Sequence, residues 1–210
     1  MPMDRIDGIL LDLLMAVMNS MQVWTAAAGD RRRGLAWRDA VTERMVAIGF
    51  YVPYESLVAD AARETGLDTG AAARLIDEWS RMEPWSDAQA LSRVPLPYGF
   101  VTNASTVLAQ TAADRSRLEP RFTMSAEEAG RFKPAADVYH AASRRLGTEP
   151  ERTLFIAGSP YDAEGARMAG LPSYLVLRRP DHGPPNERIS VATSLEDVVA
   201  SLHPYGPVTR

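Results

Sequence analysis

The fold is decided by the stretch IDGILLD, residues 6–12 of the sequence. A continuous apolar run of this length is typical of a buried parallel strand. The run ends in one carboxylate, Asp12. Because ligands of open α/β sheets bind at the carboxyl ends of the strands, Asp12 is expected at a binding site. An Asp after an apolar run is also a common turn former or helix N-cap, so the position alone does not assign chemistry.

The composition limits the classes of function. The chain has 210 residues, of which 46% are hydrophobic, which is enough for one sizeable core or a core domain with a smaller addition. The net charge of -4 gives no electrostatic footprint for nucleic acid, and the basic cluster Arg31–Arg33 is predicted to be a solvated loop. The absence of cysteine excludes disulfides, thiolate metal sites and a Cys nucleophile.

The histidines and the apolar segments argue against a histidine metal site and a membrane span. The three histidines, His140, His182 and His203, are scattered, which argues against a histidine metal site. No uninterrupted apolar segment approaches the length of about 18 residues that suggests a membrane span. We therefore expect a soluble cytoplasmic protein without membrane partners.

Helical patterns fill the first half of the chain after the opening strand. Residues 13–28 can be drawn as one largely buried helix. Residues 35–92 show apolar positions at helical spacing with no strand signal, and they predict about four helices. From Pro95 onward, short β-type runs alternate with helical segments. That alternation predicts right-handed βαβ units and a doubly wound parallel sheet. The expected architecture is an α/β core, residues 1–15 and 93–210, with a helical cap, residues 16–92.

Polar groups follow four of the predicted strands or their loops. They are Asp12, the pair Thr102-Asn103, Lys133 and Asp162. Each has an ordinary alternative, since Thr102, Asn103 or Asp162 can cap a helix and most lysines lie on the surface. Because parallel strands present their carboxyl ends at one sheet edge, the four positions together predict one crevice that binds a small molecule.

These residues, in this order, resemble the haloacid dehalogenase (HAD) superfamily, and within it the L-2-haloacid dehalogenase type. Asp12 matches the family's nucleophile, and Arg38 follows Trp37 where the family has a Trp-Arg pair that meets the substrate carboxylate or the leaving halide. Thr102-Asn103 matches the second motif. The resemblance also implies a homodimer formed through the cap. The third and fourth motifs are matched by Lys133-Pro134 with Tyr139, and by Asp162, Gly165 and Gly170.

Departures from the family pattern bear on the reaction. Phosphatases of the superfamily have an acid two residues after the nucleophile, where this chain has Leu14, and the paired acids of magnesium-dependent members are missing. Phosphatase activity, a magnesium site and any other cofactor are therefore not expected. Ala16 replaces a Thr of the dehalogenases, and Ala157-Gly158-Ser159 replaces a Ser-Ser-Asn run. The resemblance implies that the lost polar groups fix the nucleophile and position the hydrolytic water, which we call the water site. Ser159 is the polar group that partly compensates for them.

Three hypotheses follow from this pattern. The preferred one is intramolecular displacement at an sp³ carbon, which fits the loss of polar groups that would position water. The resemblance to HAD-like proteins associated with aziridine formation in antibiotic biosynthesis suggests this reaction as an example. The alternative is hydrolytic 2-haloacid dehalogenation, in which Asp12 attacks, Arg38 and Asn103 stabilise the leaving anion, Lys133 keeps Asp12 ionised and water acts near Asp162. The third is a non-catalytic binding subunit. The leaving group, whether halide, sulfate or phosphate, is left open, and the aromatic residues that could line an apolar pocket are Trp24, Trp37, Trp85 and Tyr161.

Overall fold

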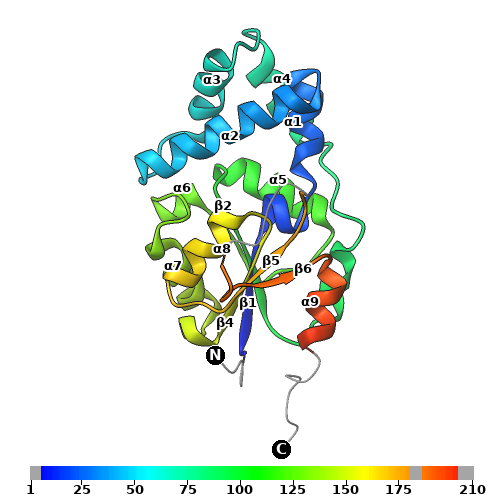
Figure 1. Ribbon diagram of the computed structural model, residues 1–210, viewed down its shortest axis with the longest axis vertical. Helices are drawn as coiled ribbons and strands as arrows, with labels where there is room; N and C mark the ends of the chain where they lie inside the picture. The colour runs from blue at the N-terminus through cyan, green and yellow to red at the C-terminus, as the bar shows by residue number, and fades with distance from the viewer. Residues whose placement is uncertain (1–5, 180–185, 203–210) are drawn as a thin grey trace, which may run out of the picture.

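The computed structural model describes residues 6–179 and 186–202 (Figure 1). Six strands form one sheet in the order β3-β2-β1-β4-β5-β6, and every neighbouring pair is parallel. β1 lies in the middle because the chain crosses from one side of it to the other after β3. The predicted doubly wound α/β fold is confirmed. The strands are β1 (Gly8–Asp12), β2 (Tyr98–Thr102), β3 (Thr123–Ser125), β4 (Thr153–Ala157), β5 (Ser173–Val176) and β6 (Ser190–Ala192).

Both faces of the sheet are buried. Ile9 and Leu11 of β1 belong to one apolar cluster, whereas Leu10 belongs to the other, as expected from the period of two along a strand. Strands buried on both faces need apolar residues throughout, which explains the unbroken run in IDGILLD. One cluster includes residues of α7 (Ala136–Leu146) and α8 (Pro160–Met168), and the other includes residues of α5 (Thr106–Ser116) and α9 (Leu195–Leu202); the shorter helices are α6 (Ala126–Ala129), η2 (Ala88–Arg93) and η3 (Pro150–Arg152).

Four helices lie beyond the carboxyl end of β1, at the top of Figure 1. Their packing centres on large aromatic side chains: the rings of Trp24 and Trp37 meet edge to face at 4.8 Å, and both side chains are buried. Trp37 Nε1 donates to the carbonyl of Val58, which ties the second helix to the third. These helices are α1 (Ser20–Ala28), α2 (Arg31–Ile48), α3 (Tyr54–Glu64) and α4 (Ala71–Trp79).

Two local predictions were wrong. Residues 13–28 do not form one helix: a five-residue π-helical turn, η1 (Leu13–Val17), is separated from α1 by Met18 and Asn19. Those two residues pair instead with the chain that returns from the helices, through a Met18–Pro84 bridge and a 2.9 Å bond from Asn19 N to Glu83 O. Arg31–Arg33 is exposed as predicted, but it forms the first turn of α2 rather than a loop.

Candidate active site

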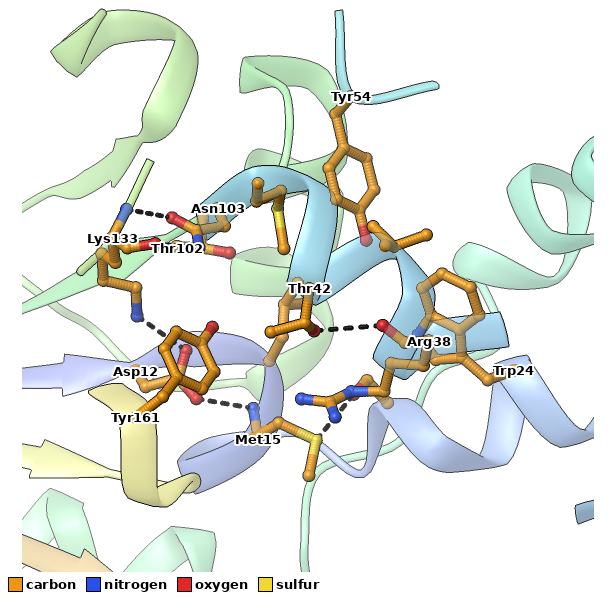
Figure 2. Close-up of a pocket in the computed structure, with 14 residues that line it drawn as sticks. Asp12, Met15, Trp24, Arg38, Thr42, Tyr54, Thr102, Asn103, Lys133 and Tyr161 are labelled. Carbon is orange, nitrogen blue, oxygen red and sulfur yellow. Dashed lines mark hydrogen bonds and ion pairs between the residues drawn. The ribbon is translucent and has the colours of Figure 1, made fainter. Parts of the chain in front are cut away.

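Asp12 ends the central strand and lies at the base of a pocket (Figure 2). The chain turns sharply into η1 directly after it, so the backbone N–H of Met15 points back at the carboxylate and donates to Oδ2 at 3.1 Å. The residue is 6% exposed. Asp12 is therefore both a cap of the following turn, as the ordinary alternative expected, and a carboxylate held in a fixed orientation under the pocket.

Lys133 joins Asp12 to a second carboxylate. Its Nζ donates to Asp12 Oδ1 at 3.0 Å, to Asp162 Oδ2 at 2.5 Å and to the carbonyl of Val101 at 3.2 Å. An ammonium has three N–H donors, so all of them are used within the protein. Burial disfavours the charged ammonium, but Asp12 and then Asp162 outweigh that effect and raise the pKa of Lys133. Lys133 is therefore a permanently charged partner of Asp12.

Asp162 lies behind Lys133, not on the pocket wall. Its side chain is 1% exposed, and its other oxygen, Oδ1, accepts a 2.5 Å bond from the hydroxyl of Tyr139. Burial raises the pKa of Asp162 to about 6, although Lys133 acts in the opposite direction. The motif match makes Tyr139 a candidate for binding the substrate or leaving group, but Tyr139 is fully buried and does not line the pocket. Both residues are placed to orient Lys133.

Asn103 fixes the loop that carries Lys133. Its Oδ1 accepts from the backbone N–H of Lys133 at 2.7 Å, and its Nδ2 donates to the carbonyl of the same residue at 3.1 Å. The neighbouring Thr102 is buried at the end of β2, and its Oγ1 accepts a long 3.4 Å bond from Ala104 N. Both Asn103 and Thr102 also line the pocket, which leaves one N–H of the Asn103 amide available to a ligand.

The rest of the pocket wall comes from the helices above the sheet, together with η1 and the start of α8. Arg38 of α2 extends into the pocket toward the η1 turn, and Tyr161 of α8 lies beside Asp12 (Figure 2). Arg38 is 12% exposed and lies 3.5 Å from the half-exposed carboxylate of Asp39. Burial raises the pKa of Tyr161 to about 12, so its hydroxyl stays protonated and can donate. The wall is completed by Met15, Ser20, Trp24, Val41, Thr42, Met45 and Tyr54.

The predicted residues thus divide into two groups. Asp12, Arg38, Thr102, Asn103, Lys133 and Tyr161 line one pocket, whereas Tyr139, Ser159 and Asp162 do not. Ser159 is buried at the start of α8 and makes no side-chain cap hydrogen bond there. The sequence analysis missed Thr42 and Tyr54. Thr42 follows Arg38 by one helical turn and was open to prediction, whereas nothing near Tyr54 marks it as part of a site.

The departures at the water site have a steric counterpart. A Cβ at Gly158 would lie 2.3 Å from the carbonyl carbon of Met15 and 2.4 Å from the nitrogen of Ala16. The η1 backbone therefore occupies the space that a side chain at position 158 would need. Leu14, where phosphatases of the superfamily have an acid, lines the pocket and cannot transfer a proton.

No group of three His, Asp or Glu side chains within residues 6–179 and 186–202 is arranged to hold a metal ion. His140 Nε2 is bonded to the carbonyl of Ala169 at 2.8 Å, while His182 and His203 lie outside the described residues. Over the same part of the chain, no helix has the length and apolar character needed to cross a membrane.

Comparison with known proteins agrees with the resemblance in the motifs. The family model for haloacid dehalogenase-like hydrolases matches residues 7–170. An (S)-2-haloacid dehalogenase of Pseudomonas putida is 29% identical over 198 residues, covering 84% of this chain and 87% of the relative. One from Pseudomonas fluorescens is 32% identical over 144 residues, covering 63% of each. The structure of L-2-haloacid dehalogenase from Xanthobacter autotrophicus with chloropropionic acid covalently bound matches the fold with a TM-score of 0.80 at 19% identity, covering 94% of this chain and 98% of that one.

These relatives decide between the broad hypotheses. They are dehalogenases by name, and the matching family is one of hydrolases, which speaks for an enzyme and against a non-catalytic binding subunit. They give no support to ring closure or to a role in antibiotic biosynthesis, the interpretation preferred from the sequence. Since the family model spans most of the 210 residues, the chain belongs to the haloacid dehalogenase-like hydrolase family.

Proposed function

We propose that this protein is a hydrolytic 2-haloacid dehalogenase in which Asp12 is the nucleophile. The observation that carries the proposal is the position of Asp12: its carboxylate is held by Lys133 and the Met15 N–H at the base of a pocket that Arg38 also lines. A carboxylate that is paired with an ammonium group, held in one orientation and shielded from bulk water suits in-line attack on an sp³ carbon.

The charges in the pocket favour a substrate with one negative charge. The three N–H donors of Lys133 are already bonded to Asp12, Asp162 and the carbonyl of Val101. Arg38 is then the other cation among the residues that line the pocket, and its planar guanidinium can bind a carboxylate through two parallel hydrogen bonds. A 2-haloacid carries one carboxylate. A phosphate monoester would bring a second charge close to Asp12, and Leu14 could not protonate its leaving group.

The proposed reaction has two steps. In the first, one oxygen of Asp12 forms a bond to C2 of the acid while the carbon–halogen bond breaks, and the halide leaves with the bonding electrons. In the second, water adds to the carbonyl carbon of the resulting ester, which releases the 2-hydroxy acid, one proton and the Asp12 carboxylate. Arg38, Asn103 and the neutral hydroxyl of Tyr161 line the pocket and can donate hydrogen bonds to the substrate carboxylate and to the leaving halide.

Residues outside the pocket are assigned supporting roles. Asp162 and Tyr139 orient Lys133 from behind, which replaces the earlier hypothesis that the water is activated near Asp162.

We also propose that residues 1–15 and 93–210 form a core domain and that residues 16–92 form a cap which supplies Arg38. The homodimer formed through the cap and the cytoplasmic location stay predictions.

The test is the release of halide and of the hydroxy acid from both enantiomers of 2-chloropropionate and 2-bromopropionate, with 3-chloropropionate as the control compound. We expect turnover of the 2-haloacids, with preference for the (S)-form that the relatives' names specify. Asp12→Asn should abolish it, while Asp7→Asn, before the opposite end of the same strand, should leave it intact. Absence of halide release from every 2-haloacid would overturn the proposal.

A further inference from the structure

We infer that Arg178, Asp87 and Trp85 are positioning residues which hold the turn after Asp12 in place. We call these three residues the hinge brace. None of them lines the pocket. The inference rests on the proposed role of Asp12 as nucleophile, but the contacts that carry it stand apart from that role.

The hinge brace satisfies three successive carbonyl groups of η1. The last carbonyls of a short helical turn have no partner inside the turn, so they must find one elsewhere. Trp85 Nε1 donates to Met15 O at 2.9 Å, Arg178 Nη2 donates to Ala16 O at 2.7 Å, and Trp85 N donates to Val17 O at 3.0 Å. The segment that aims the Met15 N–H at Asp12 is thus fixed by groups from two distant parts of the chain.

The brace is itself rigid. Arg178 and Asp87 form a two-pronged ion pair, with Nη1 2.8 Å from Oδ2 and Nη2 2.9 Å from Oδ1, and their side chains are 6% and 10% exposed. The guanidinium also stacks 4.9 Å from the ring centre of Trp85. Asp87 accepts a further 2.8 Å bond from the N–H of Leu195, the first residue of α9. A planar pair joined by two parallel hydrogen bonds fixes the relative orientation of its groups in addition to their electrostatic attraction.

This arrangement is a costly way to hold a fold together. Burying two charges requires their desolvation, and apolar residues of similar volume often stabilise a protein as well or better. In addition, Nε of Arg178 is buried and has no hydrogen-bond partner among the described residues. Defined orientation of the Ala16 carbonyl is a function that apolar packing could not supply, and it accounts for a charged pair at this place.

A second close contact restricts η1, at the end of β4. Gly158 leaves no room for a Cβ against the backbone of Met15 and Ala16. The turn is therefore in contact with both the end of β4 and the hinge brace, and we expect that the Met15 N–H cannot move away from Asp12 without disturbing one of these contacts.

The brace also connects the nucleophile to the helices above the sheet. Trp85 and Asp87 follow directly after Glu83 and Pro84, which pair with Asn19 and Met18 at the place where the chain leaves the core. The outgoing and returning chain segments thus meet beside η1. If the hinge brace moved, η1 would move with it, and the Met15 N–H would shift relative to the Asp12 carboxylate without any change in the part of the pocket wall that the helices above the sheet form.

The experiment uses the full chain and four proteins: wild type, Arg178→Lys, the double variant Arg178→Met with Asp87→Asn, and the control Arg152→Met. The double variant leaves no unpaired buried charge, which protects folding. Arg152 forms a partly exposed pair with Asp7 below the other end of β1, so the control removes the same kind of contact away from the site. Amide hydrogen exchange of residues 13–19, turnover of 2-chloropropionate and the unfolding temperature are measured on each.

For the double variant we expect faster exchange in residues 13–19 and a kcat lowered about 10- to 100-fold, the range in which small misplacements of a reacting group fall. KM should stay near the wild-type value because Arg38 is untouched. Arg178→Lys should lie between, and Arg152→Met should match wild type in both measurements. Unchanged exchange in residues 13–19, or a loss of activity explained by a lower unfolding temperature alone, would overturn the inference. An inactive wild type with the expected exchange pattern would instead overturn only the proposed function.

Discussion

Lys133 and Asp162 meet in the interior of the protein, with Nζ 2.5 Å from Oδ2 and both side chains only 1% exposed. The same ammonium contacts Asp12 Oδ1 at 3.0 Å, so one cation separates two carboxylates. Removing the cation would leave both acids facing each other without compensation. On the proposed mechanism, the chemistry of Asp12 depends on the Lys133–Asp162 contact, although Asp162 does not line the pocket.

The first prediction concerns Lys133 itself. Lys133→Met keeps most of the apolar side chain but removes its charge, so it should abolish dehalogenation and lower the free energy of unfolding by about 3–5 kcal/mol, as breaking a buried pair does. Denaturant unfolding and halide release measure the two effects. Equal loss in the control Arg145→Met, which breaks an exposed pair with Glu128, would contradict this account.

The second prediction concerns pH. Because the pKa of Asp162 is raised to about 6, its carboxyl becomes neutral below that pH and Lys133 loses one anionic partner. We expect kcat to fall on the acid side with an apparent pKa near 6. Tyr139→Phe removes a hydrogen bond that lowers this pKa, so it should move the acid limb to higher pH. Tyr98→Phe, whose hydroxyl only accepts from Glu119 N, should leave the profile unchanged.

The same shift bears on stability, with a defined sign. Asp162 keeps its proton to higher pH in the folded protein than in the unfolded chain, where the pKa of Asp is about 3.9. Between these values the folded state binds more protons, so the contribution of this group to the free energy of unfolding falls as pH rises from about 4 to about 6. Asp162→Asn should remove that slope in denaturant unfolding measured across this window. A slope that persists unchanged would assign it to another group.

The third prediction separates substrate binding from chemistry. Arg38→Met should raise KM for 2-haloacids roughly 10- to 100-fold, because a hydrogen bond to a charged group contributes about 1.5–3 kcal/mol. Arg38→Lys keeps the charge but loses the planar fork, so it should restore only part of the affinity. Arg32→Met, on the exposed first turn of the same helix, is the matched control. An unaltered KM in Arg38→Met would show that Arg38 does not bind the substrate.

The fourth prediction concerns the close approach of β4 and η1. Gly158→Ala places a Cβ against the Met15 backbone, so it should destabilise the fold by about 1–3 kcal/mol, the usual cost of overpacking, and also reduce kcat. Gly70→Ala meets only the flexible end of Arg74 and the carboxylate of Asp68, and it should change neither quantity much. Wild-type stability in Gly158→Ala would show that the turn has room to move.

The sequence predicted the parts of the site that depend on regular structure. The apolar run 6–12 placed Asp12 at the end of a central strand, and parallel topology then brought Thr102, Asn103 and Lys133 to the same edge. It did not place the break at Met18 and Asn19, because the extended backbone there is set by pairing with residues 83 and 84, which lie far away in the sequence.

Contacts between distant segments were equally out of reach. Arg178 bonds to the carbonyl of Ala16, which lies 162 positions earlier in the chain, and no local pattern marks either residue. Tyr139 and Asp162 carried the right motif signal, but the sequence could not tell a residue in the pocket from one behind it. That distinction depends on the side to which Lys133 extends.

The central claim is that Asp12 attacks the substrate carbon, and isotope transfer tests it most directly. One turnover of 2-chloropropionate with excess enzyme is run in water enriched in oxygen-18, followed by mass spectrometry of the Asp12 peptide and of the product. The account predicts oxygen-18 in the Asp12 carboxylate and an unlabelled hydroxyl in the hydroxy acid. Labelled product with an unlabelled Asp12 would mean that water attacks the carbon directly, and would contradict the account.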